Sequence, residues 1–185
     1  MKRFLPLLFL FVILLTSCAA GTYIPDQNSS FSILLENREL FDRAVEETKA
    51  NGFNCTVSST VYYNPESVSS LTGTYIINME SNTAEKYQSA AFASLSENCS
   101  VKVIDLVVKE DGLLICSFDF CKPGRDYDYG IYYVSEDRPI YFGDPSAPLT
   151  RDQNGFSYTV KTGMGSSMTY YTEQISDHYY YYEIS

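Results

Sequence analysis

Residues 101–120 read VKVIDLVVKEDGLLICSFDF, and this stretch decides the fold of the chain. Apolar residues fall on both faces of the segment Val101–Lys109, which is typical of a strand that is covered on both sides and central in its sheet. Asp111-Gly112 is the dipeptide most typical of a tight hairpin turn. Residues 113–120 then form the returning strand, so the sequence predicts an antiparallel hairpin at the centre of a sheet.

The chain before this hairpin predicts helices alternating with strands. Apolar residues at helical spacing predict a helix over 37–50, and alternating side chains predict strands over 53–63 and 73–79. A second helix is expected to begin at Asn82, because Glu85 three residues later completes a capping box. The apolar stripe of the first helix consists of Leu40, Phe41, Ala44, Val45 and Thr48.

These elements form two αββ units, at residues 36–80 and 82–120. Similar four-residue stretches, 54–57 and 98–101, follow the two expected helices. The similarity indicates either a duplicated unit or a chance match of short length.

The chain after Gly124 shows only strand patterns, which predict a tyrosine-rich antiparallel meander over residues 127–184. The expected fold is therefore α+β: two helices packed on one face of a curved antiparallel sheet that ends in this meander, all within one domain at 36–185. An all-β barrel with helical decorations is the alternative. The expected meander strands are 129–135, 138–143, 155–162, 168–175 and 178–184.

The first residues predict an export signal. A basic start, Met1-Lys2-Arg3, precedes a 12-residue apolar run at 4–15, which is too short to span a bilayer as a helix. Leu15-Thr16-Ser17-Cys18 then resembles the lipobox of bacterial lipoproteins. The resemblance implies that residues 1–17 are removed and that Cys18 carries a diacylglyceryl anchor with acyl chains such as palmitate. Cleavage after Ala20 without a lipid is the alternative, and would give a secreted protein.

A lipidated Cys18 implies a protein of the cell envelope, on the outer face of the cytoplasmic membrane or on the outer membrane. The small and polar residues that follow predict a flexible tether over 18–35. The mature chain would carry 11 basic and 23 acidic residues, a formal charge of -12. We therefore expect the domain to stand off an anionic lipid surface.

Composition excludes several functions. The formal net charge of -10 opposes binding to phosphates, so no nucleic-acid partner is expected. His178 is the only histidine of the chain, and no recognisable nucleophile motif accompanies it. Asp126 and Asp128 resemble a fragment of a calcium loop but lack its other ligands. We expect no catalytic residue, metal or cofactor.

Four cysteines remain beyond Cys18, and an even number in an exported chain predicts two disulfides. The predicted hairpin places Cys99 near the sheet end that holds Cys121, which favours the pairs Cys99–Cys121 and Cys55–Cys116. Free buried thiols, acting as small apolar residues, are the alternative.

Tyrosine is the unusual feature of the composition, because 12 of the 17 tyrosines lie between residues 127 and 182. One interpretation is cross-strand packing. The other is a contact surface that includes Tyr170, Tyr180 and Tyr182, since tyrosine gives a large contact area at low entropy cost. The leading functional hypothesis is a membrane-anchored, non-enzymatic module that binds an unknown protein or small molecule. A small envelope hydrolase with a cysteine or carboxylate site, or a structural envelope protein, is the alternative.

Overall fold

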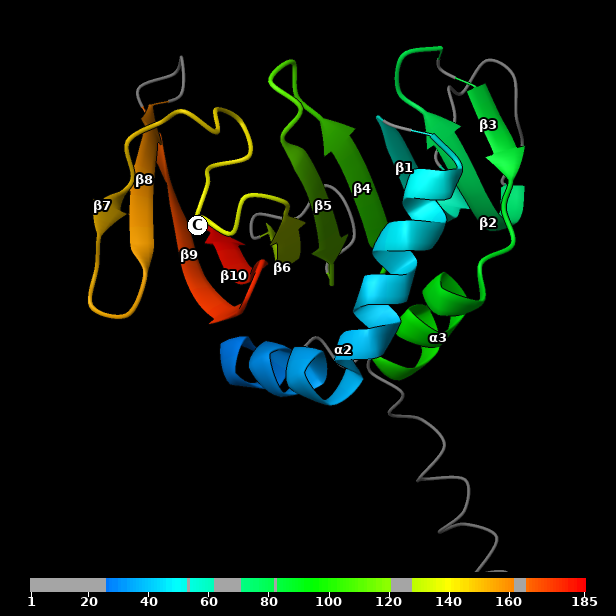
Figure 1. Cartoon of the computed structure of the whole chain (residues 1–185), viewed down its shortest axis with the longest axis horizontal. Coiled ribbons are helices and arrows are strands. Elements are labelled where there is room, and N and C mark those ends of the chain that lie inside the picture. Colours follow the sequence, from blue (N-terminus) through cyan, green and yellow to red (C-terminus); the bar gives the residue numbers. More distant parts are fainter. Residues whose placement is uncertain (1–25, 53, 62–70, 82, 121–127, 162–165) are drawn as a thin grey trace, which may run out of the picture.

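A computed structural model describes residues 26–52, 54–61, 71–81, 83–120, 128–161 and 166–185. In these residues it has two helices and one antiparallel sheet of ten strands, which fits the expected α+β class and also fits a mainly β fold (Figure 1). The elements are α2 Gln27–Ala50, β1 Cys55–Val61, β2 Leu71–Asn78, β3 Thr83–Lys86, α3 Ala90–Asn98, β4 Val103–Val108, β5 Leu114–Asp119, β6 Asp128–Val134, β7 Thr150–Arg151, β8 Phe156–Lys161, β9 Ser167–Ser176 and β10 Tyr179–Ile184.

The strands follow the order β3-β2-β1-β4-β5-β6-β10-β9-β8-β7 across the sheet. The predicted hairpin is β4–β5, and its central place in the sheet is confirmed. Its turn is longer than predicted: Lys109 N donates to Leu113 O, and Gly112 N donates to Lys109 O. Gly112 takes the left-handed φ of +86° that this bulged turn requires. A tight two-residue turn at Asp111-Gly112 would pair Val108 with Ile115, whereas Val108 pairs with Leu114, one position away from that predicted register.

Helix α2 is bent, and both of its halves contact the sheet or α3. Asn37 has non-helical angles (φ −122°, ψ 21°), and its side-chain Nδ2 donates to Ile33 O. The two halves therefore run in different directions (Figure 1). Phe41, in the second half, meets Phe118 of β5 at a ring-centroid distance of 4.8 Å, in an edge-to-face contact. The buried residues of α2, α3 and the central strands belong to one apolar cluster.

The predicted tether is wrong for residues 27–35, which form the first half of α2. Asp26 caps this helix, because its side chain accepts a hydrogen bond from Ser29 N at 2.8 Å. Ser30 donates its hydroxyl proton to Asp26 O, and Leu34 is fully buried. The serines and asparagine that resemble a linker thus form a capped helix with a buried side.

The second helix begins later than predicted. Residues 83–86 form strand β3, which pairs with β2 from Tyr75 to Asn78. Helix α3 starts after Ser89, whose hydroxyl accepts from Phe92 N. Two further predictions fail in the second half of the chain: residues 138–143 form no strand, and the short strand β7 was not predicted.

The αββ duplication stays a prediction. Strands β1 and β4 lie side by side and antiparallel, an arrangement that two related units can give. The left-handed residue of the first junction is Asn54 (φ +56°), whereas that of the second is Ser100 (φ +63°). These two residues do not align when Asn54 is matched with Asn98.

Candidate functional site

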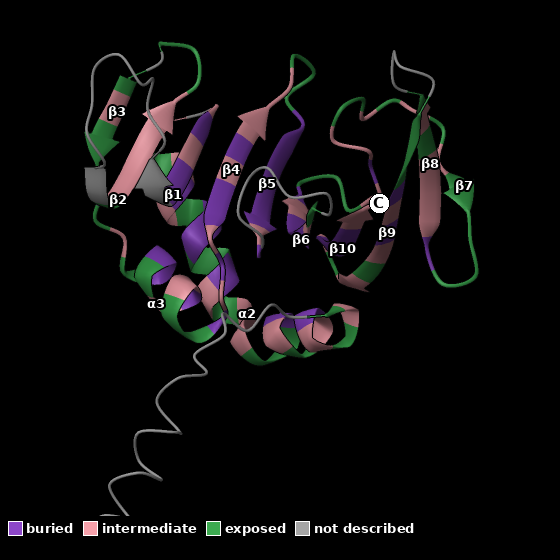
Figure 2. Cartoon of the chain, turned by 180° about the vertical axis from the view of Figure 1, so that it is seen from behind, coloured by how far each residue is buried: buried purple, intermediate pink, exposed green. Residues whose placement is uncertain are grey.

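The sheet has two faces of different chemistry. On the face covered by α2 and α3, Cys55, Leu106 and Cys116 form one row across β1, β4 and β5. The opposite face is covered by no helix of the described residues and is called the helix-free face. On it Asp105 pairs with Ser117, and Ser117 pairs with Tyr132. Figure 2 shows that buried residues concentrate in the central strands, while β3, β7 and several loops are exposed.

The tyrosines predicted as a contact surface are buried. Tyr170, Tyr180 and Tyr182 expose 0%, 2% and 3% of their surface. They belong to a second core cluster on the helix-free face, where Phe142 packs edge-on against Tyr182 at 4.8 Å. The contact-surface prediction is therefore wrong for these three residues, because residues of the loop between β6 and β7 cover them.

A chain of hydrogen bonds fixes this tyrosine cluster. Thr172 donates its hydroxyl proton to Tyr181 O at 2.8 Å, so its oxygen must accept from Tyr132 OH, which lies 2.9 Å away. Tyr132 OH in turn accepts from Ile140 N at 3.1 Å. These bonds tie β6 and β9 to the covering loop, which makes the cluster a rigid support.

Asp119 lies beside this cluster and is bound by one of its tyrosines. Tyr182 pairs with Gly130, and Gly130 pairs with Asp119 on the next strand. A Cβ atom at Gly130 would lie 2.2 Å from Phe118 O and 2.9 Å from Tyr182 Cε1. Glycine thus leaves room for Tyr182 OH to reach across β6 and donate to Asp119 Oδ1. Burial, reinforced by the charge of Asp105, raises the pKa of Asp119 to about 7.

Asp105 is a second half-buried carboxylate on the same face. Thr56 of β1 donates its hydroxyl proton to Asp105 Oδ1. Burial raises the pKa of Asp105, and the bond from Thr56 lowers it in part. The ion pairs within the described residues join Arg38 to Asp42, Lys49 to Glu46 and Arg138 to Glu136, so none of them neutralises Asp105 or Asp119. Carboxylates with reduced hydration and no nearby cation are costly to a fold, and such groups are concentrated at functional sites.

Asp105 lies in a cleft of about 330 Å³ on the helix-free face. One end of the cleft is polar, the middle is apolar, and Lys109 stands at the other end. Lys109 Nζ donates to Phe142 O over 3.5 Å, a long bond that leaves two of its protons for other acceptors. The described lining residues are Thr56, Met79, Asp105, Val107, Lys109, Ile115, Ser117 and Phe142.

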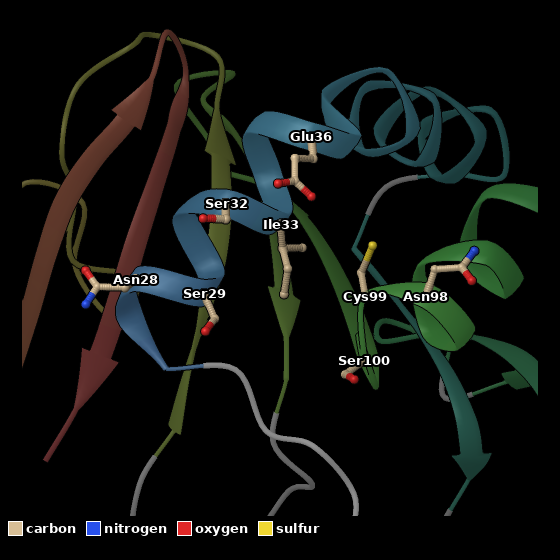
Figure 3. A pocket seen from close by; sticks show the side chains of 8 residues that line it. All are labelled: Asn28, Ser29, Ser32, Ile33, Glu36, Asn98, Cys99 and Ser100. Atoms are coloured by element: carbon tan, nitrogen blue, oxygen red, sulfur yellow. The ribbon is translucent and has the colours of Figure 1, made fainter.

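A second, more polar groove of about 370 Å³ lies between the first half of α2 and the end of α3 (Figure 3). Glu36 is its only charged residue among those described, and Ile33 is its only large aliphatic one. Asn28 points away from the α3 side of the groove in Figure 3. This groove offers a ligand fewer complementary groups than the cleft on the helix-free face. The described lining residues are Asn28, Ser29, Ser32, Ile33, Glu36, Asn98, Cys99 and Ser100.

The predicted Cys55–Cys116 disulfide is wrong, because both cysteines are free and buried. They flank Leu106 from strands two positions apart, so their Cα atoms lie about 10 Å from each other, beyond disulfide reach. Burial raises the pKa of Cys55 to about 11 and that of Cys116 well above its usual value. Cys99 is also free and buried, which contradicts the predicted Cys99–Cys121 pair, and Cys121 itself lies outside the described residues. Protonated, buried thiols of this kind are poor nucleophiles.

His178 belongs to the turn between β9 and β10. It has a left-handed φ of +66°, its Nδ1 lies 3.0 Å from Val134 O, and its ring stacks on Tyr133 at 5.7 Å. Asp128 begins β6, while Asp126 lies outside the described residues. Within the described part of the chain, no three His, Cys, Asp or Glu side chains gather as a metal site.

Sequence reasoning missed Asp105, Asp119 and Lys109. The available signal was a carboxylate inside each of two apolar strands, VIDLVV and LICSFD, at positions that face the same side of the sheet. Among the described residues, no helix is long and apolar enough to cross a membrane. Comparison with family models, curated proteins and solved structures gives no match, so the function argued below depends on the residues of this chain.

Proposed function

We propose that this chain is a lipid-anchored binding module of the bacterial cell envelope, and that its ligand occupies the cleft beside Asp105. The observation that carries the proposal is a cavity with a carboxylate, hydroxyls, apolar walls and an ammonium, next to a second carboxylate that has no ion pair within the described residues. Ligand sites typically combine apolar walls with a few convergent polar groups.

In this proposal the two sides of the sheet have separate tasks. Helices α2 and α3 cover one face, and the tyrosine-rich strands β6, β9 and β10 brace the other face beside the cleft. The tyrosines therefore act as support, through Phe142, which belongs both to their cluster and to the cleft wall. This assignment replaces the direct tyrosine contact expected from composition.

The anchor half of the proposal is supported by the lipobox, and the early start of α2 limits the length of the tether. A lipid on Cys18 would leave only residues 19–26 before the helix at Gln27, a distance of at most about 30 Å. The domain would then work close to the membrane, and its charge of -12 would hold it off anionic lipid. Intact mass of protein from its own cell tests this: a start at Cys18 with added acyl mass is expected, and a start at Gly21 without lipid contradicts it.

The binding half is tested by photo-crosslinking in the native host. A photoreactive phenylalanine at Met79, which is 46% exposed and lines the cleft, should yield an adduct. Met168, 39% exposed on β9, is the matched control and should yield none. Asp105→Asn should remove the Met79 adduct while the domain stays folded. An adduct that is equal at both positions, that survives Asp105→Asn, or that fails to form overturns the binding proposal.

A carboxylate hydrolase is the second candidate, and one observation favours it. Asp105 and Asp119 lie on adjacent strands and the same face, and a pKa of about 7 for Asp119 suits a general acid. The cysteine version lacks this support, because the described thiols are buried. If the cleft ligand is turned over, Asp119→Asn should stop its conversion while leaving the Met79 adduct intact. A ligand recovered unchanged from wild-type protein contradicts the hydrolase.

A further inference from the structure

The floor of the cleft is a strip that changes chemistry along strand β4. Asp105 and Val107 of β4 and Lys109, which directly follows the strand, occupy alternate positions, and all three line the cleft on the same face of the sheet. Ile115 pairs with Val107, and Ser117 pairs with Asp105. The strip therefore runs from a carboxylate through two apolar side chains to an ammonium.

The carboxylate end is arranged for a cationic group. Thr56 donates to Asp105 Oδ1, and the described residues give Asp105 Oδ2 no partner, so Oδ2 can accept from a ligand ammonium. Ser117, which pairs with Asp105 on the neighbouring strand, bonds with its hydroxyl to Asp119. Asp119, one row further along β5, lies on the same face. Arg and Lys of the described residues form their ion pairs elsewhere.

The other end is arranged for an anionic group. Lys109 is the one Lys or Arg among the described lining residues, and its long bond to Phe142 O satisfies only one of its protons. Asp144 is near enough for Lys109 to lower its pKa, but Ser146 already donates to Asp144 Oδ1 from both its backbone N and its hydroxyl. The ammonium of Lys109 can thus donate hydrogen bonds to a ligand carboxylate or phosphate.

The middle of the cleft requires an apolar linker. The Cα atoms of Asp105 and Lys109 are four strand residues apart, roughly 13 Å. Between these two residues, Val107 and Ile115 form the floor of the cleft, and Met79 and Phe142 line it as well. Phe142 is held by edge-on contacts to Tyr132 at 4.8 Å and Tyr170 at 5.6 Å, so that wall is rigid. Met79 is exposed and unbranched, and can adapt to the ligand.

We propose that the cleft binds a zwitterionic ligand, with an ammonium group at Asp105, an acidic group at Lys109, and an aliphatic segment over Val107 and Ile115. The inference rests on the proposed binding function and adds the chemical class of the ligand. The shared chemistry is that of an ω-amino acid. A free small molecule or a lysine residue at the carboxyl end of a peptide can supply it.

The test is an NMR titration of the full mature domain with three six-carbon probes: 6-aminohexanoic acid, hexylamine and hexanoate. The zwitterion should bind about tenfold more tightly than either singly charged probe, because only it meets both ends of the strip. The largest shifts should fall on Val107, Ile115 and Met79. Shorter 3-aminopropanoic acid should lose most of this gain, because its charges cannot reach both ends.

Two variants, one at each end of the cleft, test the ligand class separately from any effect on folding. Asp105→Asn should make the zwitterion bind no better than hexanoate, and Lys109→Met should make it bind no better than hexylamine. Lys161→Met, an exposed change on β8, is the matched control and should change nothing. Thermal melting confirms that each variant is folded.

The outcomes separate this inference from the proposed function. Probes that shift cleft residues without a preference for the zwitterion overturn the ligand class but leave the cleft as a binding site. The ligand class is also overturned if both Asp105→Asn and Lys109→Met keep the preference for the zwitterion over the singly charged probes. A missing Met79 adduct in the native host overturns the proposed function instead. A C-terminal lysyl peptide that competes for the same shifts identifies the peptide source, and one that fails to compete identifies the free small molecule.

Discussion

Over β6, β9 and β10, the helix-free face is closed by the chain's own aromatic side chains, whereas over β1, β4 and β5 it holds carboxylates and a cleft. Both halves contain polar groups. In the part over β6, β9 and β10, called the aromatic half, Thr172 and Tyr132 form hydrogen bonds to each other and to the backbone. In the part over β1, β4 and β5, called the cleft half, Asp105 and Asp119 are desolvated without an ion pair within the described residues. One half is therefore closed mainly by its own contacts, although the buried Tyr170 hydroxyl has no hydrogen-bond partner among the described residues. The other half retains carboxylates that a ligand can satisfy.

The largest loss of stability is expected when the packing of the aromatic half is disrupted. Replacing Tyr180 and Tyr182 together by serine removes two buried rings and leaves cavities, at a cost of about 5 kcal/mol or more. Because whole domains are stable by about 5–15 kcal/mol, the double variant should be largely unfolded. Circular dichroism and urea unfolding measure this. A fully folded double variant would show that the tyrosines are a surface and not a support.

A smaller loss of stability is expected at Gly130, at the boundary between the aromatic half and the cleft half. Gly130→Ala places a Cβ against Phe118 O and the ring of Tyr182, so β6 must shift and Tyr182 must leave Asp119. We expect destabilisation by about 2 kcal/mol. Urea unfolding measures the loss. An unchanged midpoint for Gly130→Ala would contradict the close packing at this position.

The sequence predicted most strands and the central hairpin, because alternation and turn dipeptides are local signals. It missed the register by one residue, since the β4–β5 turn takes a bulge at Gly112. Burial of Tyr170 depends on Tyr141 and Phe142 of a distant loop, which no local pattern reports. The carboxylates of the proposed binding site were missed for another reason: a single carboxylate within an apolar strand was not treated as a signal.

The third expected effect is a pH dependence of stability, which arises from Asp119 in the cleft half. Burial raises the pKa of Asp119 to about 7 from 3.8, so the folded chain holds a proton that the unfolded chain releases. Wild-type stability should therefore fall as pH rises from about 4 to about 7. Asp119→Asn removes this slope and should stabilise the domain at pH 8 by about 1 kcal/mol, a value reduced for solvent screening.

Thermal melts of wild type and Asp119→Asn between pH 4 and pH 8 check this difference. The two curves should approach each other at the acidic end, where wild-type Asp119 is neutral, and separate as the pH rises. Equal melting temperatures at pH 8 would mean that the Asp119 carboxylate is well solvated, and the contrast between the two halves would weaken accordingly.

The smallest effect is expected at Asp137, in the aromatic half, and its pH dependence has the opposite sign. His178 N donates to Asp137 Oδ1 at 2.6 Å, and this bond is the main cause that lowers the pKa of Asp137. The lowered pKa gives stability above the unfolded value of about 4, and this stability is lost as the pH falls through the folded value.

Because Asp137 is exposed, Asp137→Asn should cost less than about 1 kcal/mol at pH 7 and nothing at pH 2. Asparagine tolerates the left-handed φ of +46° at this position, so the variant isolates the charge from the backbone. Melts at both pH values measure it. A loss that is as large at pH 2 as at pH 7 would assign the effect to geometry, and would leave Asp119 as the carboxylate whose ionisation distinguishes the two halves of the face.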